Sequence, residues 1–197
     1  PAALCVQALQ RAGVSPDDGD ILVTGATGGV GGVSILLLTA LGYRVVASTG
    51  KVDQVDYLND LGAVEVLDRR LLSERGKPLQ KERWAGVVDS VGSHTLVNAC
   101  ASTRYGGAVT SCGLAQGMDF PASVAPFILR GVSLLGVDSV MASHSRRVEA
   151  WALLDQFVDR RKLAGTVTTV GLHEVVGLAA QMLAGERHGR IVVDVNR

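Results

Sequence analysis

The sequence predicts an α/β protein whose core is a parallel, doubly wound sheet of six strands. Between residues 21 and 137, six short apolar segments alternate with helical or loop segments, and parallel strands need such crossovers. The composition agrees, because 47% of the 197 residues are hydrophobic and 24 are glycines, which suit tight strand-to-helix turns. Two βαβαβ halves in succession give the strand order 3-2-1-4-5-6.

Each predicted strand is a run of apolar residues that stops at a polar or glycine-rich turn. The six strands are expected at Ile21 to Thr24, Val45 to Ala47, Val64 to Leu67, Ala85 to Ser90, Ala108 to Cys112 and Val132 to Val137. The helix after the first strand ends at Gly42 and has one apolar face. Further helices are predicted over residues 54–61, 95–102 and 127–130.

The last part of the chain does not continue the repeat of the sheet. We expect a long amphipathic helix from Ser145 to Leu163, then a strand, another helix and a last strand from Ile191 to Val195. We therefore divide the chain into a domain over residues 1–163 and a second segment over residues 164–197. Because a helical pattern begins directly at Pro1, we interpret the chain as a piece of a longer protein.

Charge and cysteine content exclude several classes of protein. The formal net charge is zero and no Lys/Arg stripe is present, so nothing favours a nucleic-acid partner or an acidic membrane surface. The three cysteines are widely spaced, which argues against a disulfide framework or a zinc site. With neither a membrane span nor a signal peptide in the pattern, we expect reduced thiols and a cytoplasmic protein.

The turn after the first strand has the spacing of a dinucleotide-binding motif. It reads Ala26-x-Gly28-x-x-Gly31, a GxGxxG pattern with alanine in the first place. Gly28 allows a pyrophosphate to approach the backbone, and Gly31 allows the helix to pack closely on the strand. The helix N-terminus offers unpaired N–H groups to the phosphates. Its place between a strand and a helix favours a Rossmann-type site, and without a Gly-Lys-Ser/Thr continuation the turn is not a P-loop.

The end of the second strand favours NADPH over NADH. An NAD site places Asp or Glu there to accept a hydrogen bond from the 2′-hydroxyl of the ribose. This chain has Ser48-Thr49-Gly50-Lys51 instead, and its first acid is Asp53. Hydroxyls and a cation suit a 2′-phosphate, and Arg69 adds a second cation after the third strand. The alternative interpretation is a solvated lysine in an ordinary turn.

Ligands of a doubly wound sheet bind beyond the carboxyl ends of its strands. The fourth, fifth and sixth strands end at residues 89–92, 112–115 and 136–139, from which a nicotinamide would be held. Arg190 precedes the last strand, and we interpret it as an exposed structural residue, with a phosphate contact as the alternative.

Several longer segments carry a family resemblance. They are Val23–Gly31, Lys81–Gly86, Asp89–Gly92, Cys112–Ala115, Pro126–Val132 and Gly136–Val140. The first is generic, whereas the last two are much more particular. With these segments the chain resembles the medium-chain dehydrogenase/reductase superfamily, in its zinc-free, quinone-oxidoreductase-like branch, and within that branch the acrylyl-CoA reductase (NADPH) family. The resemblance covers essentially the whole chain.

The resemblance implies an oxidoreductase that transfers a hydride from NADPH to the β-carbon of acryloyl-CoA, a short 2-enoyl-CoA, and gives propionyl-CoA. This hydride transfer needs no metal, since the thioester carbonyl delocalises the charge of the enolate that forms. By the same resemblance, the pyrophosphate, the 2′-phosphate and the nicotinamide end are expected to meet three groups of residues. These are Thr27, Gly28, Gly29 and Val30; Thr49, Gly50, Lys51 and Arg69; and Leu114, Ile128 and Ser139.

Members of this family begin with a GroES-like catalytic domain whose last strands return from the C-terminus. The resemblance therefore implies that residues 164–197 are the C-terminal part of such a domain. The residues that orient the substrate or donate the proton would lie outside this chain, so no catalytic residue is named and the chain alone is expected to turn over little.

Two other functions stay open, an NADPH:quinone oxidoreductase and a non-catalytic NADPH-binding module. The sixth strand lies at a sheet edge with an apolar run over residues 132–135, which predicts a homodimer through that edge.

Overall fold

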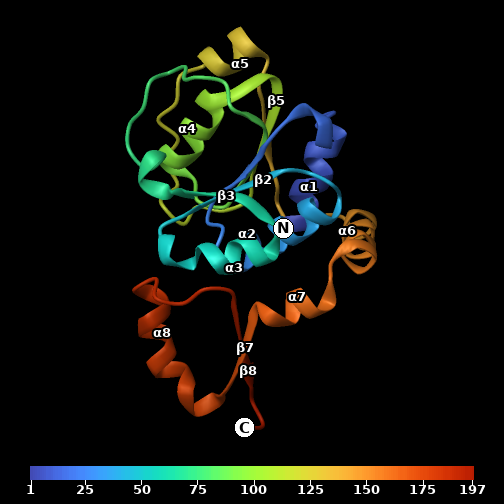
Figure 1. Cartoon of the computed structure of the whole chain (residues 1–197), viewed down its shortest axis with the longest axis vertical. Coiled ribbons are helices and arrows are strands. Elements are labelled where there is room, and N and C mark those ends of the chain that lie inside the picture. The colour runs from blue at the N-terminus through green and yellow to red at the C-terminus, as the bar shows by residue number, and fades with distance from the viewer.

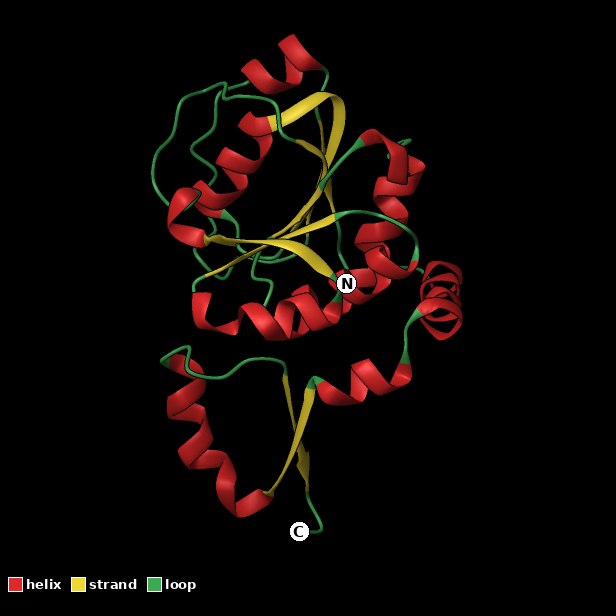
Figure 2. Cartoon of the chain, viewed as in Figure 1, coloured by secondary structure: helices red, strands yellow, loops and turns green.

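The main body of the computed structural model, which describes residues 1–197, is a sheet covered by helices on both faces (Figures 1 and 2). Six parallel strands lie in the order β3-β2-β1-β4-β5-β6, which confirms the predicted fold class and strand order. The strands are β1 (Ile21–Val23), β2 (Val45–Thr49), β3 (Ala63–Asp68), β4 (Trp84–Asp89), β5 (Thr103–Ser111) and β6 (Ser133–Gly136).

Two layers of helices enclose the sheet. The layer on one face contains α1 (Ala2–Arg11), α2 (Gly29–Ala40), α3 (Val55–Leu61) and α6 (His144–Phe157). The layer on the other face contains α4 (Ser93–Ser102) and α5 (Ala125–Arg130). Figure 1 shows α4 and α5 on the side of the sheet away from α2 and α3.

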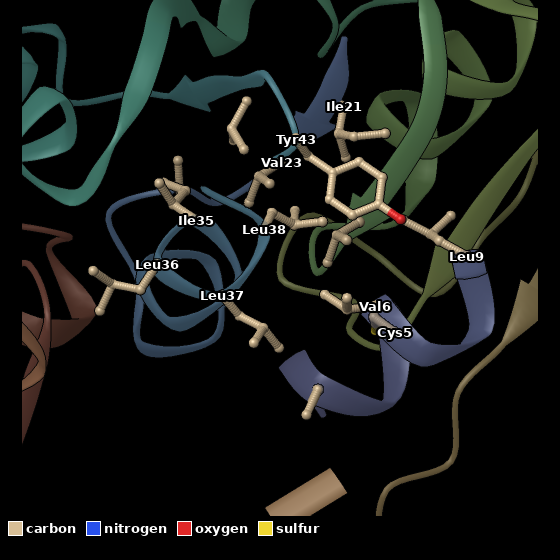
Figure 3. Close-up of a cluster of buried hydrophobic side chains, with 14 of the residues drawn as sticks. Cys5, Val6, Leu9, Ile21, Val23, Ile35, Leu36, Leu37, Leu38 and Tyr43 are labelled. Atoms are coloured by element: carbon tan, nitrogen blue, oxygen red, sulfur yellow. The ribbon is translucent and has the colours of Figure 1, made fainter. Parts of the chain in front are cut away.

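Alternate residues of the central strands supply the two halves of the core. Ile21 and Val23 point into a cluster of 25 buried residues shared with α1 and α2, part of which is drawn in Figure 3. Leu22, between them, points into a cluster of 11 residues on the opposite face. All three are completely buried, which is why the strand reads as an unbroken apolar run and not as an alternating one.

The long helix predicted from Ser145 to Leu163 is wrong: the structure has two helices, α6 and α7 (Arg160–Gly165). Val158 is extended, with φ −82° and ψ 123°. The carboxylate of Asp159 then accepts hydrogen bonds from the N–H groups of Arg161 and Lys162, at 2.7 and 3.2 Å, and so begins a new helix. The apolar Val158 fits a helical pattern, so the spacing alone did not reveal the break.

The end of the chain forms a small separate unit in the lower part of Figure 1. Two parallel strands, β7 (Val167–Gly171) and β8 (Arg190–Asp194), pair with each other and are joined by α8 (Val175–Leu183). They are no part of the six-stranded sheet, as expected, while the assignment of residues 164–197 to a GroES-like domain stays a prediction. No helix in the structure has both the length and the apolar character that spanning a lipid bilayer requires.

Candidate functional site

The glycine turn joins β1 to α2 at the centre of the sheet. Gly25 has a φ of +60°, which favours glycine, and its carbonyl accepts a hydrogen bond of 2.9 Å from the N–H of Gly28. Gly28 is the N-cap of α2 and no side chain caps this helix. The first N–H groups of α2 are therefore free of side-chain partners, as an anion-binding helix N-terminus requires.

Helix α2 approaches the turn so closely that position 31 accepts only glycine. A Cβ atom built on Gly31 would lie 2.4 Å from the carbonyl oxygen of Gly25 and 2.6 Å from the Cα of Ala26. Both neighbours are backbone atoms, which cannot move aside without moving the turn. This is the close packing of helix on strand that the third glycine of the motif is expected to allow.

The end of β2 brings hydroxyls and two cations next to this turn. The hydroxyls of Thr27 and Thr49 lie 3.1 Å apart, and Thr49 Oγ1 also accepts the N–H of Lys51 at 3.0 Å. Arg69 comes from the residue after β3 and lies over Gly50, because a Cβ at Gly50 would be 2.6 Å from its Nε. The structure thus gathers all four residues expected to meet a 2′-phosphate.

The two cationic side chains at the end of β2, Lys51 and Arg69, lie close to each other. Burial lowers the pKa of Lys51; the carboxylate of Asp53 opposes this shift, and the nearby Arg69 adds to it. Arg69 has no ion pair within the chain, whereas its neighbour Arg70 is paired with Asp68. Arg69 forms no ion pair and lies close enough to Lys51 to lower the pKa of that lysine, so an anion bound between them would be stabilised by both cations.

A segment from the C-terminal unit, residues 187–190, folds back over the glycine turn. The N–H of Gly189 donates to the carbonyl of Thr27 at 2.8 Å, and Lys51 Nζ donates to the carbonyl of Arg187. The ring of His188 lies 4.7 Å from that of Tyr57 on α3. This segment therefore contacts both the pyrophosphate end and the 2′-phosphate end of the expected site.

Arg190 is the functional candidate that the sequence left open. Its side chain is exposed, as interpreted, but its guanidinium lies over the first turn of α2, since a Cβ at Gly29 would be 2.5 Å from one of its terminal nitrogens. A cation at this point stands where the pyrophosphate is expected. In the sequence, only the position of Gly189-Arg190 before an apolar strand pointed to a role for Arg190. Nothing in the sequence indicates that Arg190 lies next to Gly29.

A cavity of about 630 Å³ opens beside α2. It gathers Gly29, Val30, Ser139 and Arg190 with apolar residues of α1 and α6. Leu114 and Ile128, the other two residues expected at the nicotinamide end, are 57% and 74% exposed and do not line this cavity. Their role stays a prediction.

The sheet order and the glycine turn at its switch point place the protein in the Rossmann-type α/β class. Residues 29–158 match the zinc-binding dehydrogenase family, and the chain belongs to that family. This confirms the superfamily indicated by the sequence motifs. No group of three or more His, Cys, Asp or Glu side chains in the chain is arranged to hold a metal ion.

Relatives and solved structures agree with this placement. The chain is 44% identical over 196 residues to acrylyl-CoA reductase AcuI of Ruegeria pomeroyi. The aligned residues are 99% of this chain and 59% of AcuI. It is 43% identical to a Bacillus subtilis protein named "Putative quinone oxidoreductase YhfP", over 98% of the chain and 59% of YhfP. The chain thus spans about 60% of the length of these relatives.

The yhdH oxidoreductase of Salmonella enterica, solved in complex with NADP, superposes with a TM-score of 0.95 at 43% identity, over 98% of the chain and 60% of yhdH. The yhfP protein of B. subtilis, solved with NAD bound, gives a TM-score of 0.92 at 43% identity, over 98% of the chain and 60% of yhfP.

The close approach at Gly31 makes a testable prediction. In Gly31→Ala, the new methyl group would push α2 away from Gly25 and Ala26. We expect the free energy of unfolding to fall by about 1–3 kcal/mol and NADPH binding to weaken by at least about tenfold. Urea unfolding and isothermal titration calorimetry measure the two effects.

Gly32→Ala is the matched control on the same helix. Its Cβ would lie 3.4 Å from Leu61 Cδ1 and from the Tyr57 hydroxyl, an ordinary contact, and alanine is the better helix former. It should bind NADPH as the wild type does. Equal behaviour of the two variants would contradict the proposed constraint.

Proposed function

We propose that this chain is the cofactor-binding part of an NADPH-dependent oxidoreductase that reduces the C=C bond of a short 2-enoyl-CoA, acryloyl-CoA, to propionyl-CoA. The observation that carries the cofactor is the acid-free end of β2, where Thr49, Lys51 and Arg69 surround Gly50 beside the open N-terminus of α2. The 44% identity to acrylyl-CoA reductase AcuI supports the substrate.

The residues of the site fit the proposed cofactor part by part. The N–H groups of the Thr27–Val30 turn would bind the pyrophosphate, and the guanidinium of Arg190 over Gly29 would neutralise its charge. The 2′-phosphate would lie between Lys51 and Arg69, next to the hydroxyl of Thr49. Ser139 and, by the family resemblance, Leu114 and Ile128 would flank the nicotinamide.

The proposed reaction divides its chemistry between cofactor and protein. NADPH supplies the hydride for the β-carbon of the thioester, and donors near the carbonyl oxygen stabilise the enolate that forms. The described residues bind and orient the cofactor from the central turn to the carboxyl ends of β4, β5 and β6. The proton for the α-carbon and the contacts to the acyl chain are assigned to a GroES-like part of a longer protein, of which residues 164–197 would be the C-terminal end.

The cofactor proposal is tested by removing one cation at a time. Lys51→Ala and Arg69→Ala should each raise the dissociation constant of NADPH about tenfold or more, because a hydrogen bond to a charged group contributes about 1.5–3 kcal/mol. NADH, which lacks the 2′-phosphate, should bind about equally to both variants and to the wild type. Fluorescence titration with both dinucleotides measures this difference.

Arg70→Ala is the matched control, since Arg70 neighbours Arg69 but is paired with Asp68. It should leave both dissociation constants unchanged. Preference of the wild type for NADH would contradict the proposal, and the NAD bound to yhfP makes this arm of the experiment necessary.

The substrate proposal is tested on the protein encoded by the complete reading frame. NADPH oxidation should be fast with acryloyl-CoA and slow with a quinone such as 1,4-benzoquinone. The opposite order would favour the second candidate, an NADPH:quinone oxidoreductase, which is supported by the 43% identity to YhfP. No oxidation with either substrate would favour a non-catalytic NADPH-binding module.

We also propose that two copies of the protein pair through the edge strand β6. Ser133 and Gly136 are exposed, Leu134 and Leu135 are half-buried, and no strand covers this edge. Sedimentation velocity over a concentration series should show twice the mass of one chain. Ser133→Lys places like charges near each other across the paired edges and should shift the equilibrium to monomer.

Val64→Lys, on the opposite edge strand β3, is the control, because Val64 is 53% exposed there. It should leave the dimer intact. A monomeric wild type at all concentrations would rule the dimer out.

A further inference from the structure

Asp89 is a buried carboxylate at the carboxyl end of β4 for which the proposed chemistry has no use. It is completely buried and has no ionic partner. Its Oδ1 accepts a hydrogen bond of 2.7 Å from the hydroxyl of Thr24, and its Oδ2 accepts the N–H groups of Gly92 and Val91 at 2.8 and 3.3 Å. Burial raises the pKa of this carboxyl, whereas these three donors lower it. A buried group of this kind is costly, and its hydrogen bonds offset that cost only while all of them are made.

The turn that Asp89 holds, Ser90–Gly92, lies between two parts of the expected cofactor site. On one side is the glycine turn: a Cβ on Gly25 would be 2.7 Å from Ser90 Oγ. On the other side is the loop after β5: a Cβ on Gly113 would be 2.5 Å from the carbonyl oxygen of Ser90. The 90–92 turn therefore acts as a spacer that touches both neighbours through backbone or near-backbone atoms.

Hydrogen bonds fix this spacer to both sides. Ser90 donates its N–H to Thr24 Oγ1 at 3.1 Å and its hydroxyl to the carbonyl of Thr24 at 3.2 Å. Toward β5, the N–H of Cys112 donates to the carbonyl of Asp89 at 2.9 Å, and that of Gln116 to the carbonyl of Val91 at 2.8 Å. The side chain of Asp89 lies at the centre of these bonds, because it joins the hydroxyl of Thr24 at the end of β1 to the N–H groups of Val91 and Gly92.

We propose that Asp89 is a positioning residue, which sets the distance between the pyrophosphate-binding turn and the nicotinamide-binding loop after β5. This inference rests on the proposed binding of NADPH. The adenosine end of the site lies on β2, on the other side of β1 from β4, and no hydrogen bond joins it to residues 90–92. Loss of Asp89 therefore weakens the hold on the nicotinamide half of the cofactor and leaves the adenosine half unchanged.

The test compares two ligands on Asp89→Asn. The asparagine amide cannot replace all three hydrogen bonds of the carboxylate. If its oxygen accepts the N–H groups of Val91 and Gly92, its NH₂ group points at Thr24 and one of the two amide N–H bonds lacks an acceptor. If the amide is reversed, the backbone N–H groups of Val91 and Gly92 lack an acceptor. The dissociation constant of NADPH should rise about tenfold or more, while that of adenosine 2′-monophosphate, which reaches only the β2 end, stays within about twofold. Titrations followed by NMR measure both ligands on the same samples.

Thr24→Val is the second variant and reports on the same link if Asp89→Asn folds poorly. It removes the hydroxyl that joins Asp89 to Ser90 and keeps the charge, so it should shift the two constants in the same pattern. Thr110→Val is its control, because Thr110 is equally buried and its hydroxyl donates to the carbonyl of Val87 on β4, at 2.9 Å, with no hydrogen bond to residues 90–92.

Asp159→Asn is the control for Asp89→Asn, since Asp159 accepts the N–H groups two and three residues later in the same way, but at the start of α7. Both controls should bind NADPH and the monophosphate as the wild type does. An unchanged NADPH constant in Asp89→Asn, or equal weakening of both ligands, would overturn the positioning role alone. Failure of the wild type to bind NADPH would instead overturn the proposed function on which it rests.

Discussion

The contact between Gly31 and the backbone of Gly25 and Ala26 is the constraint on which the site depends. It brings the start of α2 against the end of β1, so the free N–H groups of the helix point out at the switch point of the sheet. The hydroxyl pair of Thr27 and Thr49 and the guanidinium over Gly29 are arranged around this fixed helix end. A shift of α2 would change the position of its N–H groups relative to all of these side chains.

Charged side chains lie on both sides of the glycine turn. The cations Lys51 and Arg69 at the end of β2 lie close enough to repel each other, while Asp53 compensates part of the charge of Lys51. On the other side of β1, the buried carboxylate of Asp89 is satisfied by three donors and fixes the neighbouring turn. The site thus has cationic side chains on one side of β1 and a fully hydrogen-bonded carboxylate on the other.

The sequence was sufficient to predict the sheet and the position of the glycine turn beside the end of β2, because both depend on local patterns. Apolar runs, glycine turns and the missing acid after β2 are all readable within a few residues of each other. The break between α6 and α7 was missed because Val158 suits a helix and only the Asp159 cap reveals the new start. The contact of Gly189 with Thr27 was missed because no local pattern encodes a partner so far along the chain. Leu114 and Ile128, for which the resemblance predicted contacts with the nicotinamide, do not line the cavity beside α2.

The fold-back of residues 187–190 onto the glycine turn also has a consequence for how the protein is made. Proteins begin to fold during synthesis from their N-terminal side, and the turn between β1 and α2 is synthesised well before residues 187–190. A nascent chain can therefore form the six-stranded sheet before residues 187–190 are available to cover the glycine turn.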